Sequence, residues 1–205
     1  MATVPLTRPV FYLLAGPNGA GKSTLYNALK AAGKLPTNAE FVNADLYEAA
    51  HLQHMPDPLA RSQAAREWAD ARRTALLAQG QSFVSETVFS HASKLALIQH
   101  AQAKGFFVLL LVVALDQPER LLTRVSQRVL EGGHNVAAQR ILARYPRTIA
   151  LLAQAVRLAD AALLHDSGDA QPGTHKLVAT CLGKITRILH QPLPQWAHTV
   201  LKLSH

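Results

Sequence analysis

A glycine-rich octapeptide constrains this chain more than any other feature of its sequence. It reads Gly16-Pro17-Asn18-Gly19-Ala20-Gly21-Lys22-Ser23. It stands between the apolar, β-prone residues 10–15 and a helical pattern over 22–32, which is the context of a Walker A loop. The glycines let successive backbone N–H groups turn toward one point, where the helix N-terminus adds its positive dipole end. The sequence therefore predicts that nucleotide phosphates bind here.

Two side chains of this loop are expected to act on the bound nucleotide. Lys22 can reach the β- and γ-phosphates, and the hydroxyl of Ser23 can ligate Mg²⁺. We therefore expect Mg²⁺ together with the nucleotide.

Strand-like and helical patterns alternate along the chain, which is typical of an α/β protein with a mostly parallel sheet. Strands are predicted over 10–15, 40–43, 82–86, 106–115 and 161–165. Helices are predicted over 22–32, 45–54, 59–79, 90–104, 118–130, 137–159 and 175–189. Ser90 is expected to cap the fourth of these helices, and Trp196 to pack on the domain from the tail. With 205 residues, we expect one domain over 1–205, with its C-terminal helix and tail at about 175–205.

Composition points to a globular protein of the cytoplasm. Hydrophobic residues make up 49% and charged residues 17% of the chain, unlike a disordered protein. The single cysteine, Cys181, excludes an internal disulfide and favours a reducing compartment. No secretory signal precedes the glycine-rich loop, and the apolar run 106–115 is far shorter than the roughly 20 residues that span a bilayer.

The net charge of +8 favours an anionic partner, such as a nucleotide, a phosphorylated sugar or nucleic acid. The basic residues are spread along the chain, with a denser group over 120–147, and form no consecutive basic run. We therefore do not expect nucleic acid as the main ligand.

A phosphate-binding loop does not by itself define the reaction. The chain has neither the Leu-Ser-Gly-Gly-Gln signature of ABC-type ATPases nor the Asn-Lys-x-Asp element of GTPases. A small kinase remains, in which an acidic residue at a neighbouring strand end meets the acceptor hydroxyl.

Asp45 is the first candidate for that acidic residue. It lies just beyond the predicted strand that ends at Asn43, and ligands of open α/β sheets bind at such carboxyl ends. A carboxylate there can orient the acceptor hydroxyl and take its proton. The alternative is structural, because Asp45 and Glu48 have approximately the spacing of a helix capping box.

Glu86 and Thr87 end the third predicted strand. Glu86 could orient the substrate or bind magnesium through water. It could also be a solvated carboxylate at a strand end.

A basic segment over 124–147 has the pattern of a lid. Arg124 and Arg128 are four residues apart, as are Arg140 and Arg144, and Gly132-Gly133 separates the two pairs. Such a lid would bring guanidinium groups onto the transferring phosphoryl group and exclude water. His134 could contact phosphate through this lid or could be exposed, and the whole segment could instead be a solvated basic face.

These motifs together resemble the zeta toxin family of P-loop kinases. The matching elements, in chain order over 10–168, are Gly16 to Thr24, Asn43-Ala-Asp45, Ser85-Glu86-Thr87, Arg124-Val, Arg128-Val-x-x-Gly-Gly-His134-x-Val136 and Arg144-Tyr145. The lid of this chain departs from the family pattern at Ala137, and His165-Asp166-Ser167 stands where the family has Asp-Asn-Ser.

The resemblance implies a kinase with a five-stranded central sheet and ATP with Mg²⁺ as the phosphoryl donor. It implies that Asp45 is the base, that Lys22 stabilises the γ-phosphate and that lid arginines, here Arg128 and Arg140, complete the catalytic site. Nucleotide contacts would come from Gly16 to Thr24 and from Arg124. The acceptor would meet Asn43, Asp45, Glu86, Thr87, His134 and Arg144.

Two hypotheses follow. The first is an ATP-dependent kinase that phosphorylates a hydroxyl of a small molecule, such as a UDP-amino sugar or another nucleotide-type metabolite. As in the family, it would be the toxin of a toxin–antitoxin pair with a protein antitoxin as partner. The second is an ATP-binding or ATP-hydrolysing switch protein without a small-molecule acceptor.

Overall fold

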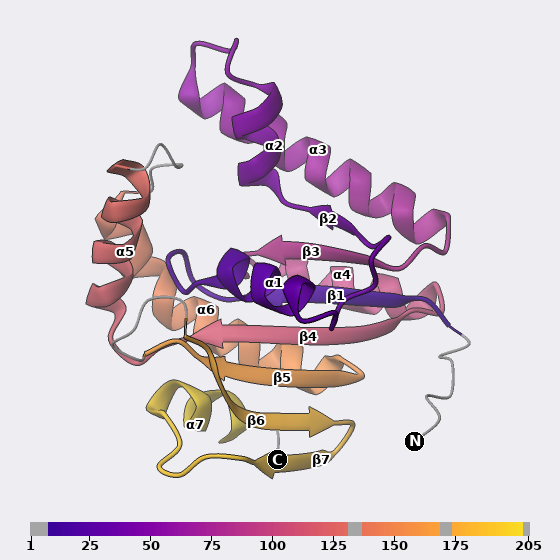
Figure 1. The fold of residues 1–205 in the computed structure, drawn as a ribbon, viewed down its shortest axis with the longest axis vertical. Coiled ribbons are helices and arrows are strands. Elements are labelled where there is room, and N and C mark those ends of the chain that lie inside the picture. The colour runs from indigo at the N-terminus through magenta and orange to yellow at the C-terminus, as the bar shows by residue number, and fades with distance from the viewer. Residues whose placement is uncertain (1–7, 131–136, 169–173, 203–205) are drawn as a thin grey trace.

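The computed structural model describes residues 8–130, 137–168 and 174–202. A single seven-stranded sheet runs through these residues, with the strand order β2-β3-β1-β4-β5-β6-β7 (Figure 1). The strands are β1 (Val10–Ala15), β2 (Glu40–Val42), β3 (Phe83–Thr87), β4 (Phe107–Ala114), β5 (Ala161–Asp166), β6 (Lys176–Leu182) and β7 (Ile185–Ile188). The five strands β2, β3, β1, β4 and β5 pair in parallel with their neighbours in the sheet. β6 and β7 add an antiparallel hairpin beside β5.

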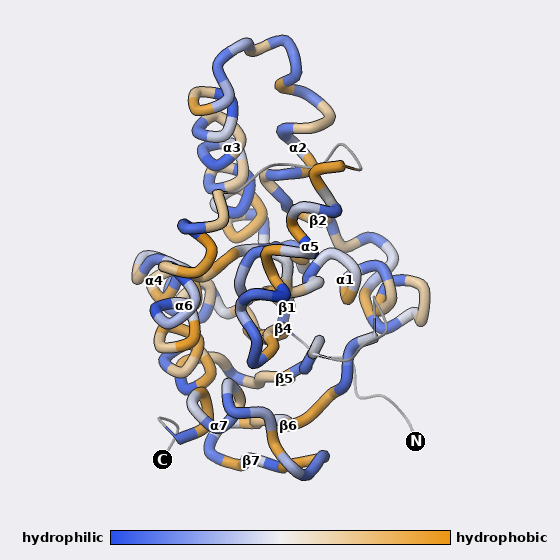
Figure 2. The backbone as a smooth tube through the Cα atoms, turned by 90° about the vertical axis from the view of Figure 1, so that its left-hand side faces the viewer, coloured by the Kyte–Doolittle hydropathy of each residue, from blue (hydrophilic) through white to orange (hydrophobic). Residues whose placement is uncertain are grey.

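Helices cover both faces of the sheet (Figure 1). They are α1 (Lys22–Ala31), α2 (Ala44–His51), α3 (Pro58–Ala78), α4 (Ser93–Ala103), α5 (Pro118–Leu130), α6 (Ala138–Leu158) and α7 (Gln195–Lys202). α5 lies beyond the arrowheads of the parallel strands, at their carboxyl ends. α2 and α3 form a projecting pair beyond β2, and Figure 2 shows their connecting segment coloured mostly hydrophilic.

The central strands bury both of their faces, which explains their near-continuous apolar sequences. On β1, Phe11 and Leu13 belong to the core beneath α4, α6 and α7, whereas Leu14 belongs to the core beneath α1 and α5. The same alternation continues on β4, where Val112 faces the first core and Val113 the second. This packing fixes the strand register, because a shift by one residue would exchange the two faces.

The α/β class and the parallel sheet predicted from the sequence are confirmed. The helix predicted over 175–189 is wrong, because this segment forms the hairpin of β6 and β7. Its β-branched residues prefer strands, and Gly183, with φ of 55°, occupies the turn between them. The five parallel strands match the number implied by the resemblance, and the hairpin extends the sheet of the described residues to seven strands.

Two smaller expectations concern helix ends and the tail. The helix predicted to begin at Ser90 begins at Ser93, so Ser90 is not its cap. Trp196 packs in the core as predicted, and its indole N–H donates to Asp166 Oδ1 at 2.8 Å. None of the helices in the described part of the chain is both long enough and apolar enough to cross a membrane.

The burial of His165 on β5 leads us to expect that the stability of the fold depends on pH. Burial first, and the charge of His175 second, lower the pKa of His165 to about 4. In the unfolded chain the imidazole of His165 has a pKa near 6.5. Between about pH 4 and pH 6.5 it therefore carries a proton in the unfolded chain but not in the folded one. Stability is present in full above pH 6.5 and falls by roughly 2 to 3 kcal/mol as the pH drops toward 4.

Replacing His165 by Leu should remove most of this dependence. The check is the free energy of unfolding by denaturant at pH 7 and pH 4.5, for wild type and His165→Leu. An equal loss of stability in both proteins would show that other groups cause it.

Candidate active site

The carboxyl ends of the first three parallel strands bring the predicted site residues together. The phosphate-binding loop follows β1, Asn43 and Asp45 follow β2, and Glu86 and Thr87 end β3. These strands are neighbours in the sheet, and β1 pairs with β3 so that Leu14 lies beside Glu86. Residues far apart in the sequence therefore meet at one edge, where open α/β sheets bind ligands.

The glycines of the loop are required by space and by backbone angle. A Cβ atom on Gly16 would lie 2.0 Å from the carbonyl oxygen of Val113 on β4. Gly21 has φ of 91°, in the left-handed region, and stands directly before α1. The loop therefore passes close to the sheet and turns sharply into the helix.

Lys22 is folded back over the loop. Its side chain is only 5% exposed, and its Nζ donates to the carbonyl oxygen of Pro17 at 2.9 Å. The same Nζ lies 3.6 Å from Glu86 Oε1. The ammonium group is thus held at the mouth of the loop, where a phosphate would meet it.

Glu86 joins three elements through one carboxylate. Its Oε2 accepts hydrogen bonds from Ser23 Oγ at 2.7 Å and from Asn43 Nδ2 at 2.9 Å. Its Oε1 faces Lys22. A hydroxyl and a carboxylate oxygen so close together are the hard oxygen donors that Mg²⁺ prefers, so Ser23 and Glu86 fit a Mg²⁺ site.

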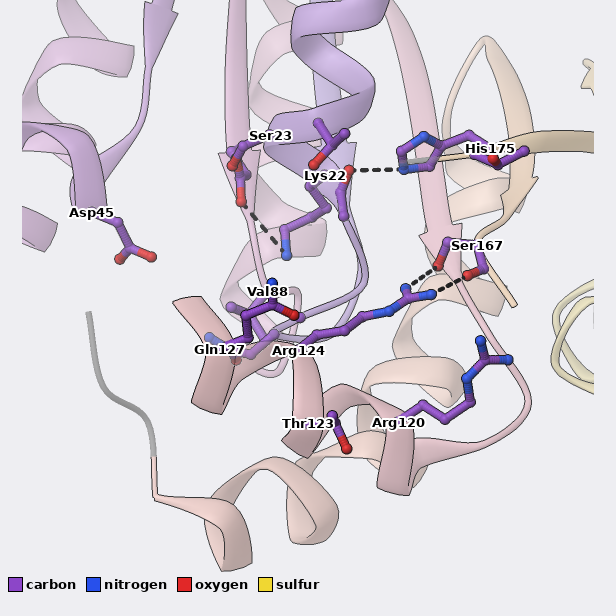
Figure 3. A pocket seen from close by; sticks show the side chains of 16 residues that line it. Lys22, Ser23, Asp45, Val88, Arg120, Thr123, Arg124, Gln127, Ser167 and His175 are labelled. Atoms are coloured by element: carbon purple, nitrogen blue, oxygen red, sulfur yellow. Dashed lines mark hydrogen bonds and ion pairs between the residues drawn. The ribbon is translucent and has the colours of Figure 1, made fainter. Parts of the chain in front are cut away.

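Asp45 is not the helix cap that the capping-box spacing suggested. Asn43 is the N-cap of α2, because its Oδ1 accepts from the backbone N–H of Leu46 at 3.1 Å. Asp45 lies in the first turn of the helix and lines the cavities of the site. In Figure 3 it lies at the side of the first cavity opposite His175.

Two cavities meet at this edge of the sheet. The first, of about 530 Å³, extends from the loop to α5 and the start of β6; besides loop residues it is lined by Arg120, Thr123, Arg124, Gln127, Ser167 and His175. The second, of about 450 Å³, lies between α3 and α6. Four residues line both cavities: Asn18, Asp45, Glu86 and Val88. The two carboxylates therefore lie at the border between the two cavities.

Arg124 reaches across the first cavity from α5 (Figure 3). Its guanidinium donates to the carbonyl oxygen of Ser167 at 2.6 Å and to Ser167 Oγ at 3.3 Å. Arg120, one turn earlier, donates to the carbonyl oxygen of Gly168. Burial first, and repulsion from Arg120 second, lower the pKa of Arg124. Two guanidinium groups are thus anchored beside the loop.

The second cavity has a cationic wall. Its basic lining residues come from three helices: Arg66, Arg73, Lys94, Arg140 and Arg144. Burial, followed by repulsion from Arg140, Arg147 and Arg66, lowers the pKa of Arg144. Like charges held this close favour an anionic ligand, which would relieve their repulsion.

Arg73 is the most deeply placed of these cations. Its side chain is 6% exposed and donates to Ser85 Oγ at 3.1 Å and to Asp70. Its buried Nε has no hydrogen-bond partner among the described residues. Asp70 also faces Lys94 at 3.4 Å, so an ionic network of Arg73, Asp70 and Lys94 lines this cavity.

Some of the predicted site residues line only one of the two cavities. Thr24 and Arg124 line the first cavity, and Asn43, Thr87, Arg140 and Arg144 line the second. Pro17 and Ala20 support the loop and line neither cavity; Ala20 is buried. The side chain of Arg128, together with Gly132, Gly133 and His134, lies outside the described residues, so the lid remains a prediction.

Sequence reasoning missed several lining residues. Arg66, Asp70 and Arg73 follow one another at helical spacing on α3, so their common face was a signal that could have been read. Ser167 directly follows the parallel strand β5 and belongs to the His165-Asp166-Ser167 motif, so a signal for it existed. His175 gave none, because the sequence predicts a helix where the hairpin of β6 and β7 forms.

The family model described as "Zeta toxin" matches residues 2–160. The chain belongs to the zeta toxin family. Its fold and family are those of a P-loop kinase, as predicted.

Solved structures share the fold of this zeta toxin family member at low sequence identity. A chain of the PezAT chromosomal toxin–antitoxin system of Streptococcus pneumoniae is 16% identical with a TM-score of 0.62, over 96% of this chain and 78% of that one. A chain of the AvrRxo1-ORF1:-ORF2 complex with ATP is 19% identical with a TM-score of 0.68, over 96% of this chain and 64% of that one. A putative kinase from Chloroflexus aurantiacus is 16% identical with a TM-score of 0.51, over 62% of this chain and 70% of that one. No curated protein matches the sequence significantly.

Replacing Lys22 tests the phosphate site directly. Lys22→Ala removes the buried ammonium group, so MgATP should bind about ten- to hundredfold more weakly, the range for a hydrogen bond to a charged group. Isothermal titration calorimetry measures this. Lys30→Ala, at the exposed end of the same helix, is the matched control and should bind like wild type. Equal affinity of Lys22→Ala and wild type would contradict the assignment.

Proposed function

We propose that this protein is an ATP-dependent kinase that transfers the γ-phosphoryl group to a hydroxyl of a nucleotide-type metabolite, such as a UDP-amino sugar. The observation that carries the proposal is the shared border of the two cavities. Asp45 and Glu86 line both of them, beside the phosphate-binding loop. A switch protein has no need of a second cavity at this position.

The first cavity is the donor half of the proposed site. Backbone N–H groups of the loop and Lys22 would hold the phosphates of ATP, with Arg124 on the opposite wall. Ser23 and Glu86 would hold Mg²⁺, which neutralises charge on the β- and γ-phosphate oxygens when bound. Lys22, which already faces Glu86 and Pro17, would stabilise the γ-phosphate.

The second cavity is the acceptor half. Asp45 would orient the acceptor hydroxyl and take its proton as the hydroxyl oxygen forms a bond to the γ-phosphorus. The bond between this phosphorus and the β–γ bridging oxygen breaks, and ADP leaves with that oxygen. Catalysis would then rest mainly on position and on electrostatic stabilisation, as expected for phosphoryl transfer.

The charge of the second cavity supports an acceptor that carries phosphate of its own. Three of its four acidic lining residues have basic partners: Glu48 pairs with Arg61, Asp70 with Arg73 and Lys94, and Glu86 with Lys22. Arg144 is repelled by Arg66 and Arg140, which line the same cavity. A diphosphate or monophosphate group of the acceptor would complement the cationic wall, whereas a neutral sugar would not.

We further propose that the protein acts as a toxin and that a protein antitoxin is its partner. Family membership and the toxin–antitoxin origin of one structural relative support this. The alternative is an ATP-dependent switch that changes its affinity for a partner. ATP hydrolysis without transfer to any acceptor would favour the switch.

Asp45→Asn tests the proposed base. The amide has the same shape but cannot accept the proton, so phosphoryl transfer should slow by about a hundredfold or more, while MgATP binding should not change. The measurement is transfer from γ-labelled ATP to a panel of UDP-sugars, nucleosides and NAD. Expression of the wild type should arrest growth, and expression of Asp45→Asn should not.

Glu67→Gln is the control for that experiment, since Glu67 is exposed on α3 and lines neither cavity. Transfer at the wild-type rate by Asp45→Asn would exclude Asp45 as the base.

Replacing Arg144 tests the proposed role of the cationic wall. Arg144→Gln should raise KM for a phosphate-bearing acceptor about tenfold, the loss of one charge-assisted contact, with KM for ATP unchanged. Arg157→Gln, on the exposed end of the same helix, is the control. A preference for acceptors without phosphate, or an equal effect on both KM values, would contradict the proposal.

A further inference from the structure

A histidine of the C-terminal hairpin lies against the phosphate-binding loop. His175 stands directly before β6, and its Nε2 is 2.9 Å from the carbonyl oxygen of Gly21 (Figure 3). The residue lines the first cavity, on the side away from Asp45. It also lies outside residues 2–160, which the family model matches. The hairpin thus adds a contact to the loop that the matched region does not contain.

The carbonyl oxygen that His175 contacts belongs to the Gly21–Lys22 peptide group, whose N–H is also a hydrogen-bond donor. Gly21 O accepts one hydrogen bond from the backbone N–H of Leu25 at 2.9 Å, and His175 occupies its second acceptor direction. In a trans peptide the carbonyl and the following N–H point in opposite directions. A bond that fixes Gly21 O therefore also fixes the direction of the Lys22 N–H, one of the amides that Walker A loops turn toward phosphate.

The loop and the imidazole ring are also in close contact. A Cβ atom on Gly21 would lie 2.8 Å from His175 Nε2. The positive φ favours glycine at position 21, and a Cβ atom there would require the His175 ring to shift. The imidazole closes one side of the turn between the loop and α1.

The start of the hairpin is firmly attached to the rest of the sheet. Lys176, the next residue, pairs with Asp166 on β5, and Asp166 accepts from the indole N–H of Trp196 at 2.8 Å. Ser167 donates its N–H to the carbonyl oxygen of Ala114 on β4 at 2.9 Å. His175 therefore projects from a braced position, which a side chain needs in order to hold another element in place.

We propose that His175 is a positioning residue of the nucleotide site, which holds the Gly21–Lys22 peptide in its phosphate-binding orientation through a hydrogen bond from Nε2–H to Gly21 O. This rests on the proposed nucleotide binding but on none of the acceptor chemistry. It gives the C-terminal hairpin a role in the donor half of the site.

Three substitutions at His175 test the proposal, because they differ in whether the side chain can place a donor within reach of the carbonyl oxygen of Gly21. The amide nitrogen of Gln stands where Nε2 of His stands, whereas the amide nitrogen of Asn stands where Nδ1 does and falls short of Gly21 O. His175→Ala and His175→Asn should bind MgATP about three- to tenfold more weakly, the loss of one hydrogen bond, and His175→Gln should stay within about twofold of wild type. Isothermal titration calorimetry with MgATP alone, without an acceptor, measures the affinities.

His190→Ala is the matched control, because His190 is an exposed histidine of the same C-terminal region that lines neither cavity. Thermal unfolding without nucleotide should be the same for Gln and Asn, so that a difference in affinity between them reports position and not folding. Equal affinity of all variants and wild type would overturn the role of His175 and leave the proposed kinase intact. Failure of the wild type to bind MgATP would overturn both.

Discussion

The carboxylate of Glu86 connects the parts of the site. One oxygen accepts from Ser23 and Asn43, and the other faces the buried ammonium of Lys22. The strand β3, the helix α1 and the N-cap of α2 are thereby held around one anionic group. Because hydrogen bonds to charged groups are the stronger ones, this arrangement fixes where Asp45 stands relative to the loop. The two cavities consequently meet beside Glu86 and Asp45.

The sheet makes this arrangement possible. Parallel strands that bury both faces direct all their carboxyl ends to one edge, and β1 between β3 and β4 places the loop at the centre of that edge. The tight passage of Gly16 over Val113 O shows how closely the loop depends on β4. The arginines that line the two cavities come from different helices: those of the first cavity lie on α5, and those of the second lie on α3 and α6. Basic side chains thus line both cavities.

The C-terminal hairpin extends the sheet beyond residues 2–160, which the family model matches. β6 and β7 continue the sheet in antiparallel sense, and α7 packs against α6 through a core that includes Trp196. The hairpin brings His175 to the loop, and its first strand pairs with β5 at Asp166, whose side chain accepts from Trp196. An addition at the edge of the sheet therefore reaches the central phosphate site without a change in the parallel strands.

The sequence alone determined the phosphate-binding loop, the alternation of strands and helices, and the strand-end carboxylates Asp45 and Glu86, because these depend on local patterns and spacing. It could not decide between Asp45 as a cap and Asp45 as a site residue, since that choice rests on which side chain Leu46 N–H meets. It misread 175–189 as a helix, where pairing with β5 outweighs local preference. His175 entered the site only through tertiary structure, because the packing of a distant segment against the loop, and no periodicity, places it there.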